Sequence, residues 1–124
     1  MIQRFSVNDR RQHPRVEKNV PLKISTADVD LVTETKNLSR TGVYCRVNKC
    51  IEPMTKLKIH LLLPLKRGAR MTTKKITCNG VIVRTEALSD NEYSLAIFFN
   101  DIAARDADSI TGYINTVLKP EKVA

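Results

Sequence analysis

Apolar residues alternate with polar ones in a series of short runs, and this period of two constrains the fold more than any other feature of the chain. In VPLKIST, Val20, Leu22 and Ile24 fall on one side and mainly polar residues on the other. Such alternation is the pattern of a strand with one buried face. Comparable runs follow at 31–36, 42–47, 55–63, 74–88 and 92–99. Six strands at short spacing, with no helix between them, predict an antiparallel barrel or sandwich.

Prolines and turn-forming residues set the expected ends of these strands. Pro64 is expected to close the strand 55–63, because proline cannot donate a hydrogen bond to a sheet. The cluster Ser89-Asp90-Asn91 predicts a turn between the last two strands. The basic segment 64–75 is expected to be a loop.

A helical period appears after residue 100, where apolar residues recur at alternating steps of four and three and predict one buried face. These residues are Ala103, Ala107, Ile110, Ile114 and Val117. Asn100 or Asp101 is expected to cap the helix, and Lys119-Pro120 to end it. We expect this helix to close one end of the barrel rather than to bind a partner.

Composition limits the function classes. A chain of 124 residues, 42% of them hydrophobic, predicts one domain with a packed core. It carries no apolar run that could span a membrane and no signal-peptide pattern, so the cytoplasm is the expected location. Cys45, Cys50 and Cys78 lack the spacing of a metal site, and His13 and His60 lack any catalytic motif. We therefore expect neither a metal site nor an enzyme.

The net charge of +8 favours anionic ligands or partners without identifying one. Between Pro53 and Arg84 there are eight basic residues and no acidic one. A small barrel that binds nucleic acid through the Lys56–Arg84 region therefore stays open as an alternative. Aromatic residues make up only 5% of the chain, which disfavours base stacking and hence this alternative.

Residues 1–18 are expected to be a flexible basic arm, in which Arg10, Arg11 and Arg15 lie close to Pro14. The proline disfavours a helix, so the arm is expected to be extended or turning. The backbone positions of Arg11 and Arg15 can then lie up to about 14 Å apart. Two guanidinium groups at that separation can hold both ends of one anionic ligand, since each can bind a phosphate or a guanine edge through two hydrogen bonds.

A second polar cluster, NLSRTG at 37–42, follows the second strand and by itself is typical of a β-turn. Asn37 offers a donor and an acceptor for a base edge, and Ser39 offers a hydroxyl for a phosphate oxygen. Gly42 permits a tight turn or a close approach of another backbone.

The two clusters together, RQHPR at 11–15 and NLSRTG at 37–42, resemble the motifs RxxxR and [D/N]xSxxG of the PilZ domain, a bacterial receptor family for cyclic di-GMP. The segments CNGVIVRTE and YSLAIFFNDI are similar to the family's fifth and sixth strands, so the resemblance covers about Arg10 to Leu118. It implies a six-stranded antiparallel β-barrel over 19–119, with the C-terminal helix, behind the arm 1–18.

The resemblance also implies a role for each motif residue. Arg11 and Arg15 would contact guanine edges and phosphates. Asn37, which stands where many relatives carry aspartate, would contact a guanine edge, and Ser39 a phosphate oxygen. Gly42 would shape the turn.

Two further positions bear on this implied site. Arg10, just before the first motif, would influence whether one cyclic di-GMP or an intercalated pair is bound, and we expect the pair. Ala96 stands where relatives often carry glycine, and it is not among the expected ligand contacts.

The function that the resemblance implies is a non-enzymatic cyclic di-GMP receptor or adaptor without a cofactor. Its arm would become ordered on binding and change the interaction with an unidentified effector protein in motility or biofilm regulation. A monomer and a homodimer both stay open. A third alternative is a PilZ-like interaction module that has lost ligand binding.

Overall fold

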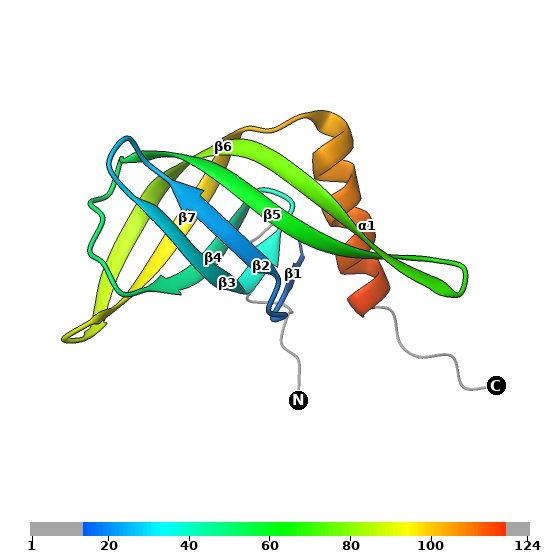
Figure 1. Cartoon of the computed structure of the whole chain (residues 1–124), viewed down its shortest axis with the longest axis horizontal. Helices are drawn as coiled ribbons and strands as arrows, with labels where there is room; N and C mark the ends of the chain where they lie inside the picture. Colours follow the sequence, from blue (N-terminus) through cyan, green and yellow to red (C-terminus); the bar gives the residue numbers. More distant parts are fainter. Residues whose placement is uncertain (1–13, 119–124) are drawn as a thin grey trace.

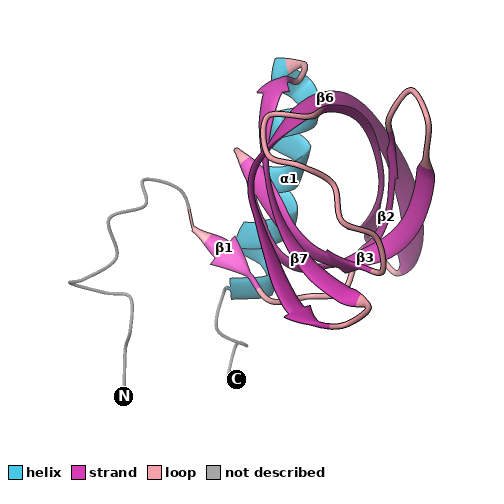
Figure 2. Cartoon of the chain, turned by 90° about the vertical axis from the view of Figure 1, so that its left-hand side faces the viewer, coloured by secondary structure: helices cyan, strands magenta, loops and turns pink. Residues whose placement is uncertain are grey.

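The structure, a computed structural model, describes residues 14–118, which form one antiparallel sheet and one helix (Figure 1). The elements are β1 (Arg15–Val16), β2 (Pro21–Ser25), β3 (Asp30–Ser39), β4 (Gly42–Val47), β5 (Lys56–Arg67), β6 (Arg70–Ser89), β7 (Glu92–Asp101) and α1 (Ala104–Leu118). The strand order is β1-β3-β2-β5-β6-β7-β4, and a further β3–β4 pairing joins the six longer strands into a ring. Figure 2 looks into this ring. The predicted all-β fold with one C-terminal helix is confirmed.

The apolar side chains of the alternating strands point inward and fill the ring. Val20, Leu22 and Ile24 are at most 2% exposed, and they belong to one core cluster that takes residues from every long strand. The predicted strands are all present, although several are longer than expected. One strand was not expected: β1 is two residues long, too short to show a period.

Helix α1 lies behind the ring in the view of Figure 2, on the side from which the β5–β6 hairpin projects in Figure 1. Its Ala107, Ile110 and Ile114 are buried, as the period predicted. Ala103 is exposed and precedes the helix, so its assignment to the buried face is wrong. Lys74 of β6 fixes α1 through a 2.7 Å hydrogen bond to the Ser109 hydroxyl.

Three predicted boundaries are wrong, and pairing explains each. Pro64 does not end β5, because β2 pairs with β5 only up to Leu61 and a proline beyond that point lies on a free edge. The expected loop 64–75 instead forms the two arms of a hairpin whose register continues to Arg67↔Arg70. Asp101 pairs with Asn79 and ends β7, so the predicted cap belongs to a strand.

The three cysteines differ in exposure. Cys45 and Cys78 are buried, and burial raises the pKa of each thiol to about 12, so both stay protonated near neutral pH. Cys50 is exposed. Within residues 14–118 no cluster of three or more His, Cys, Asp or Glu side chains could hold a metal ion. No helix in that range is long and apolar enough to span a membrane.

Candidate functional site

A β-bulge in β3 decides which way the second motif faces. Thr35 is fully buried, so before the bulge the odd-numbered residues point into the ring. The register shifts between Thr35 and Asn37, which pair with two successive residues of β4. One extra residue reverses the alternation, so Leu38 now faces the core. Asn37 and Ser39 therefore point to the outer side of the sheet, where Ser39 is only 2% exposed.

The short strand β1 brings Arg15 to the same outer face. Val16 pairs with Leu38, and both are buried in the core. Arg15 pairs with Ser39, and antiparallel partners point to the same side of a sheet. The structure thus brings together the described residues of the two motifs, whereas Arg10 and Arg11 lie outside the described residues.

The turn between β3 and β4 is shorter than the sequence suggested. Asn37, Leu38 and Ser39 belong to β3, and only Arg40 and Thr41 form the turn, so the assignment of the whole NLSRTG cluster to a turn is wrong. The Ser39 hydroxyl oxygen accepts a 3.2 Å hydrogen bond from the Thr41 backbone N–H. This bond holds the hydroxyl at the strand end.

Arg40 lies inside the second motif, but its side chain binds helix α1. Its Nη1 donates to Asp108 Oδ1 at 2.8 Å and to the Thr111 hydroxyl at 2.9 Å. The same Asp108 contact is an ion pair. The charge of Arg40 therefore tethers the β3–β4 turn to α1.

Gly42 is required by space rather than by backbone conformation. A Cβ at this position would lie 2.3 Å from the backbone oxygen of Ile97 on β7. Among the described glycines only Gly68, at the hairpin tip, has a positive φ. Gly42 therefore lets β4 and β7 approach each other closely. This approach lies next to Ser39, because Gly42 pairs with Ser39 of β3.

Asn37 offers the site an acceptor that the protein does not use. Its Oδ1 is buried and has no hydrogen-bond partner among the described residues. A buried acceptor left unsatisfied costs about 1–3 kcal/mol, so a ligand donor placed there would be favoured. Such an acceptor suits a ligand that carries N–H donors.

Two residues that the sequence did not single out complete this face. Tyr44 is the β4 partner of Asn37, and the Arg15 guanidinium carbon lies 5.2 Å from the centre of its ring. Arg84 of β6 donates from Nη2 to the Tyr44 hydroxyl at 2.7 Å. The alternation in 42–47 could have placed Tyr44 outside, but no sequence signal joins it to Arg84.

Two of the eight basic residues of the Lys56–Arg84 region are bound to other parts of the protein. Lys74 is bound to α1, and Arg84 to Tyr44. On β5 the pKa of His60 is lowered by burial and then by Lys75 and nearby lysines. The other cations lie along β5 or at the hairpin tip: Lys56, Lys58, Lys66, Arg67 and Arg70.

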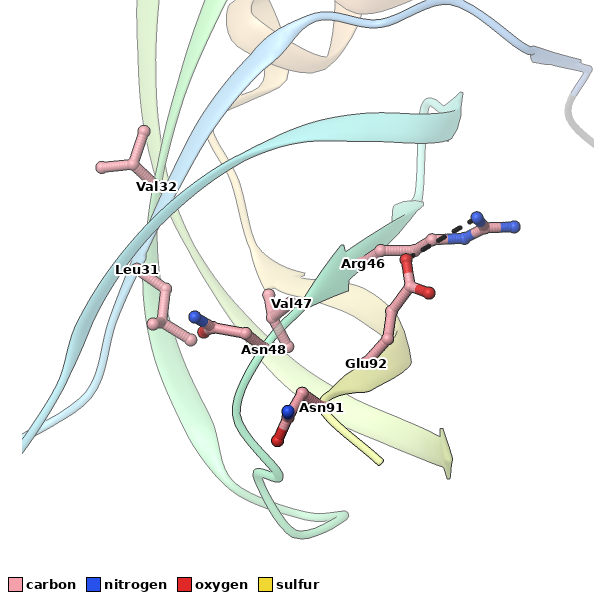
Figure 3. Close-up of a pocket in the computed structure, with 7 residues that line it drawn as sticks. All are labelled: Leu31, Val32, Arg46, Val47, Asn48, Asn91 and Glu92. Carbon is pink, nitrogen blue, oxygen red and sulfur yellow. Dashed lines mark ion pairs between the residues drawn. The ribbon is translucent and has the colours of Figure 1, made fainter. Parts of the chain in front are cut away.

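A hollow of about 300 Å³ lies between β3, β4 and the β6–β7 turn (Figure 3). Its charged residues, Arg46 and Glu92, are 3.8 Å apart and point toward each other in Figure 3. None of the described motif residues lines it. The hollow is therefore separate from the face that carries Arg15 and Asn37.

Comparison with known proteins gives matches in sequence and in fold. The PilZ domain family model matches residues 9–116. The structure is similar to the Bacillus subtilis inhibitor of motility MotI (DgrA), with 19% identity, a TM-score of 0.77 and coverage of 92% of this chain and 54% of that one. Escherichia coli YcgR in complex with c-di-GMP is similar with 12% identity, a TM-score of 0.65 and coverage of 87% and 46%.

The isolated PilZ domain of Escherichia coli YcgR, solved with c-di-GMP, matches with 12% identity and a TM-score of 0.60 over 90% of this chain and 92% of that one. This chain therefore spans about half of MotI and of full-length YcgR, but nearly all of the isolated domain. At these identities the likeness shows the fold. No curated protein sequence matches the chain.

Proposed function

Because its sequence matches the family over residues 9–116, the chain belongs to the PilZ domain family, and we propose on that premise that it is a non-enzymatic receptor for cyclic di-GMP. The observation that carries the proposal is the pairing of Arg15 with Ser39 on the outer face of the sheet, with Asn37 beside them. Two motifs that lie more than 20 residues apart in sequence thus present complementary groups to one ligand.

Each group suits a part of this ligand, which carries two phosphates and two guanines. Arg11 and Arg15 supply charged forks for phosphates and guanine edges. Asn37 presents its unsatisfied Oδ1 to guanine donors, and Ser39 presents its hydroxyl to a phosphate oxygen. Gly42 contributes the close approach of β4 and β7. The c-di-GMP complexes of YcgR support the choice of ligand, because they contain a domain of the same fold.

Isothermal titration calorimetry with the full chain tests the proposal. Cyclic di-GMP is expected to give saturable heat at micromolar protein, whereas GTP, which lacks the second guanine and the ring of two phosphodiesters, is expected to give little. Since Arg10 extends the first motif to RRxxxR, we expect two ligands per chain, bound as an intercalated pair. Absence of heat with cyclic di-GMP would remove the receptor function.

We further propose that binding orders the N-terminal arm, residues 1–18. In the described part, β1 is held to β3 by only two residue pairs, so a ligand that contacts Arg11 and Arg15 adds much to its attachment. Hydrogen exchange measured across residues 5–18 is expected to slow when cyclic di-GMP is added. Equal exchange rates in the two states would exclude this part of the proposal.

The output that fits these features is control of a partner protein. A receptor of this kind acts through the surface that it presents, and the likeness to an inhibitor of motility supports a role in motility or biofilm regulation. We propose a cytoplasmic protein that works as a monomer or homodimer on an effector.

A further inference from the structure

Two guanidinium groups flank one aromatic ring on the outer face of the sheet. The guanidinium carbons of Arg15 and Arg84 lie 5.2 Å and 5.9 Å from the ring centre of Tyr44. Arg84 also donates to the Tyr44 hydroxyl at 2.7 Å. The ring thus links a residue of the first motif to an arginine that lies 42 positions beyond the end of the second one, at Gly42.

A second β-bulge, in β6, aims Arg84 at this face. Ile82 pairs with Ile97, and both point into the core. Regular alternation would turn residue 84 inward as well, but the register shifts between 82 and 84 and pairs Arg84 with Ala96. Ala96 is also the β7 partner of Tyr44. Tyr44, Ala96 and Arg84 therefore form one row across three strands.

Ala96 makes the contact across this row possible. It lies between the two larger side chains and is only 7% exposed, because they cover it. A methyl group is short enough to leave the Arg84 guanidinium within hydrogen-bond distance of Tyr44. The small side chain of Ala96 thus permits the contact between Tyr44 of β4 and Arg84 of β6.

The charge of Arg84 is not compensated by a carboxylate among residues 14–118. Two other arginines differ in this respect, since Arg40 pairs with Asp108 and Arg46 with Glu92. Arg15 and Arg84 both carry a positive charge, and both contact the ring of Tyr44. Each therefore raises the positive potential around this ring. An anion bound close to both guanidinium groups would be attracted by each.

We propose that Tyr44 and Arg84 extend the ligand site beyond the two sequence motifs, with Arg84 contacting a phosphate of the cyclic dinucleotide that Arg15 binds. This inference rests on the proposed function. Nη2 of Arg84 is held by the Tyr44 hydroxyl, which leaves its other N–H groups for phosphate oxygens. Tyr44 acts as a positioning residue: its hydroxyl fixes Arg84, and its ring supports Arg15.

The test is calorimetry with cyclic di-GMP on the full chain. Arg84→Ala is expected to weaken binding about 10-fold, as the loss of one charge-assisted hydrogen bond does. Tyr44→Phe, which keeps the ring, is expected to weaken it about 3-fold by releasing Arg84. Because the hydroxyl acts through Arg84, the double variant should bind no more weakly than Arg84→Ala alone. Additive losses would overturn the positioning role of Tyr44.

Arg46→Ala is the matched control, since Arg46 lies on the same strand as Tyr44 and its charge is already paired with Glu92. The affinity of this variant for cyclic di-GMP is expected to stay within 2-fold of wild type. That result would show that the loss of one surface charge is not enough to weaken binding. Arg84→Gln, which keeps most of the side chain, serves if the alanine variant unfolds. Wild-type affinity in both Arg84 variants would overturn the inference and leave the receptor function standing. Absence of binding by the wild-type chain would overturn both.

Discussion

The double variant Arg11→Ala, Arg15→Ala is expected to lose at least about 100-fold in affinity for cyclic di-GMP. Each arginine makes charge-assisted hydrogen bonds in the proposed site, and such bonds contribute about 1.5–3 kcal/mol apiece. The contribution of Arg15 is expected to be large because its side chain is held in place. It is half-buried, pairs with Ser39 and lies over the Tyr44 ring. Calorimetry at matched ionic strength measures the loss.

Arg70→Ala provides the control for charge, because it removes a cation at the tip of the β5–β6 hairpin. Its affinity is expected to remain near that of wild type. Arg15→Lys separates charge from geometry: a lysine keeps the charge but cannot form the two-pronged contact, so most of the affinity should still be lost. Retention of wild-type binding by the double variant would show that the arginine arm is not part of the site. An equal loss in Arg70→Ala would instead support general attraction of anions.

Much of the fold could be predicted because its strands each bury one face. The alternation that placed Val20, Leu22 and Ile24 on one side is the alternation that fills the ring. The boundaries failed where pairing between distant strands decides the outcome. Pro64 can remain in β5 only because β2 stops short of it, and Asp101 remains in β7 because Asn79 pairs with it. Neither fact is visible in the local sequence.

The sequence did not reveal how the predicted site residues are oriented. The resemblance to two family motifs predicted that Arg15, Asn37 and Ser39 act together, and the structure places these three on one face. Their common orientation depends on a bulge in β3, which adds one residue without leaving a distinctive sequence. Arg84 depends on a second bulge as well as on the register of three strands, so a motif search could not find it.

The variant Gly42→Ala is expected to lower the free energy of unfolding by about 3 kcal/mol, at the upper end of the usual cost of overpacking. Its methyl group would lie 2.3 Å from the backbone oxygen of Ile97, and a backbone atom cannot rotate away as a side chain can. Relief requires β4 and β7 to separate, which weakens the 2.9 Å bond from the Phe99 N–H to the Thr41 oxygen. Urea denaturation followed by circular dichroism gives the free energy.

Gly112→Ala in α1 is the matched control, because a Cβ there meets nothing within 4 Å. Alanine is favoured over glycine inside a helix, so this variant should be more stable than wild type by about 0.5–1 kcal/mol. The opposite signs of the two changes would show that the effect at Gly42 comes from the close strand approach and not from the loss of a glycine. If Gly42→Ala were as stable as wild type, β4 and β7 would have room for a side chain, and the role of Gly42 would have to be sought in the ligand alone.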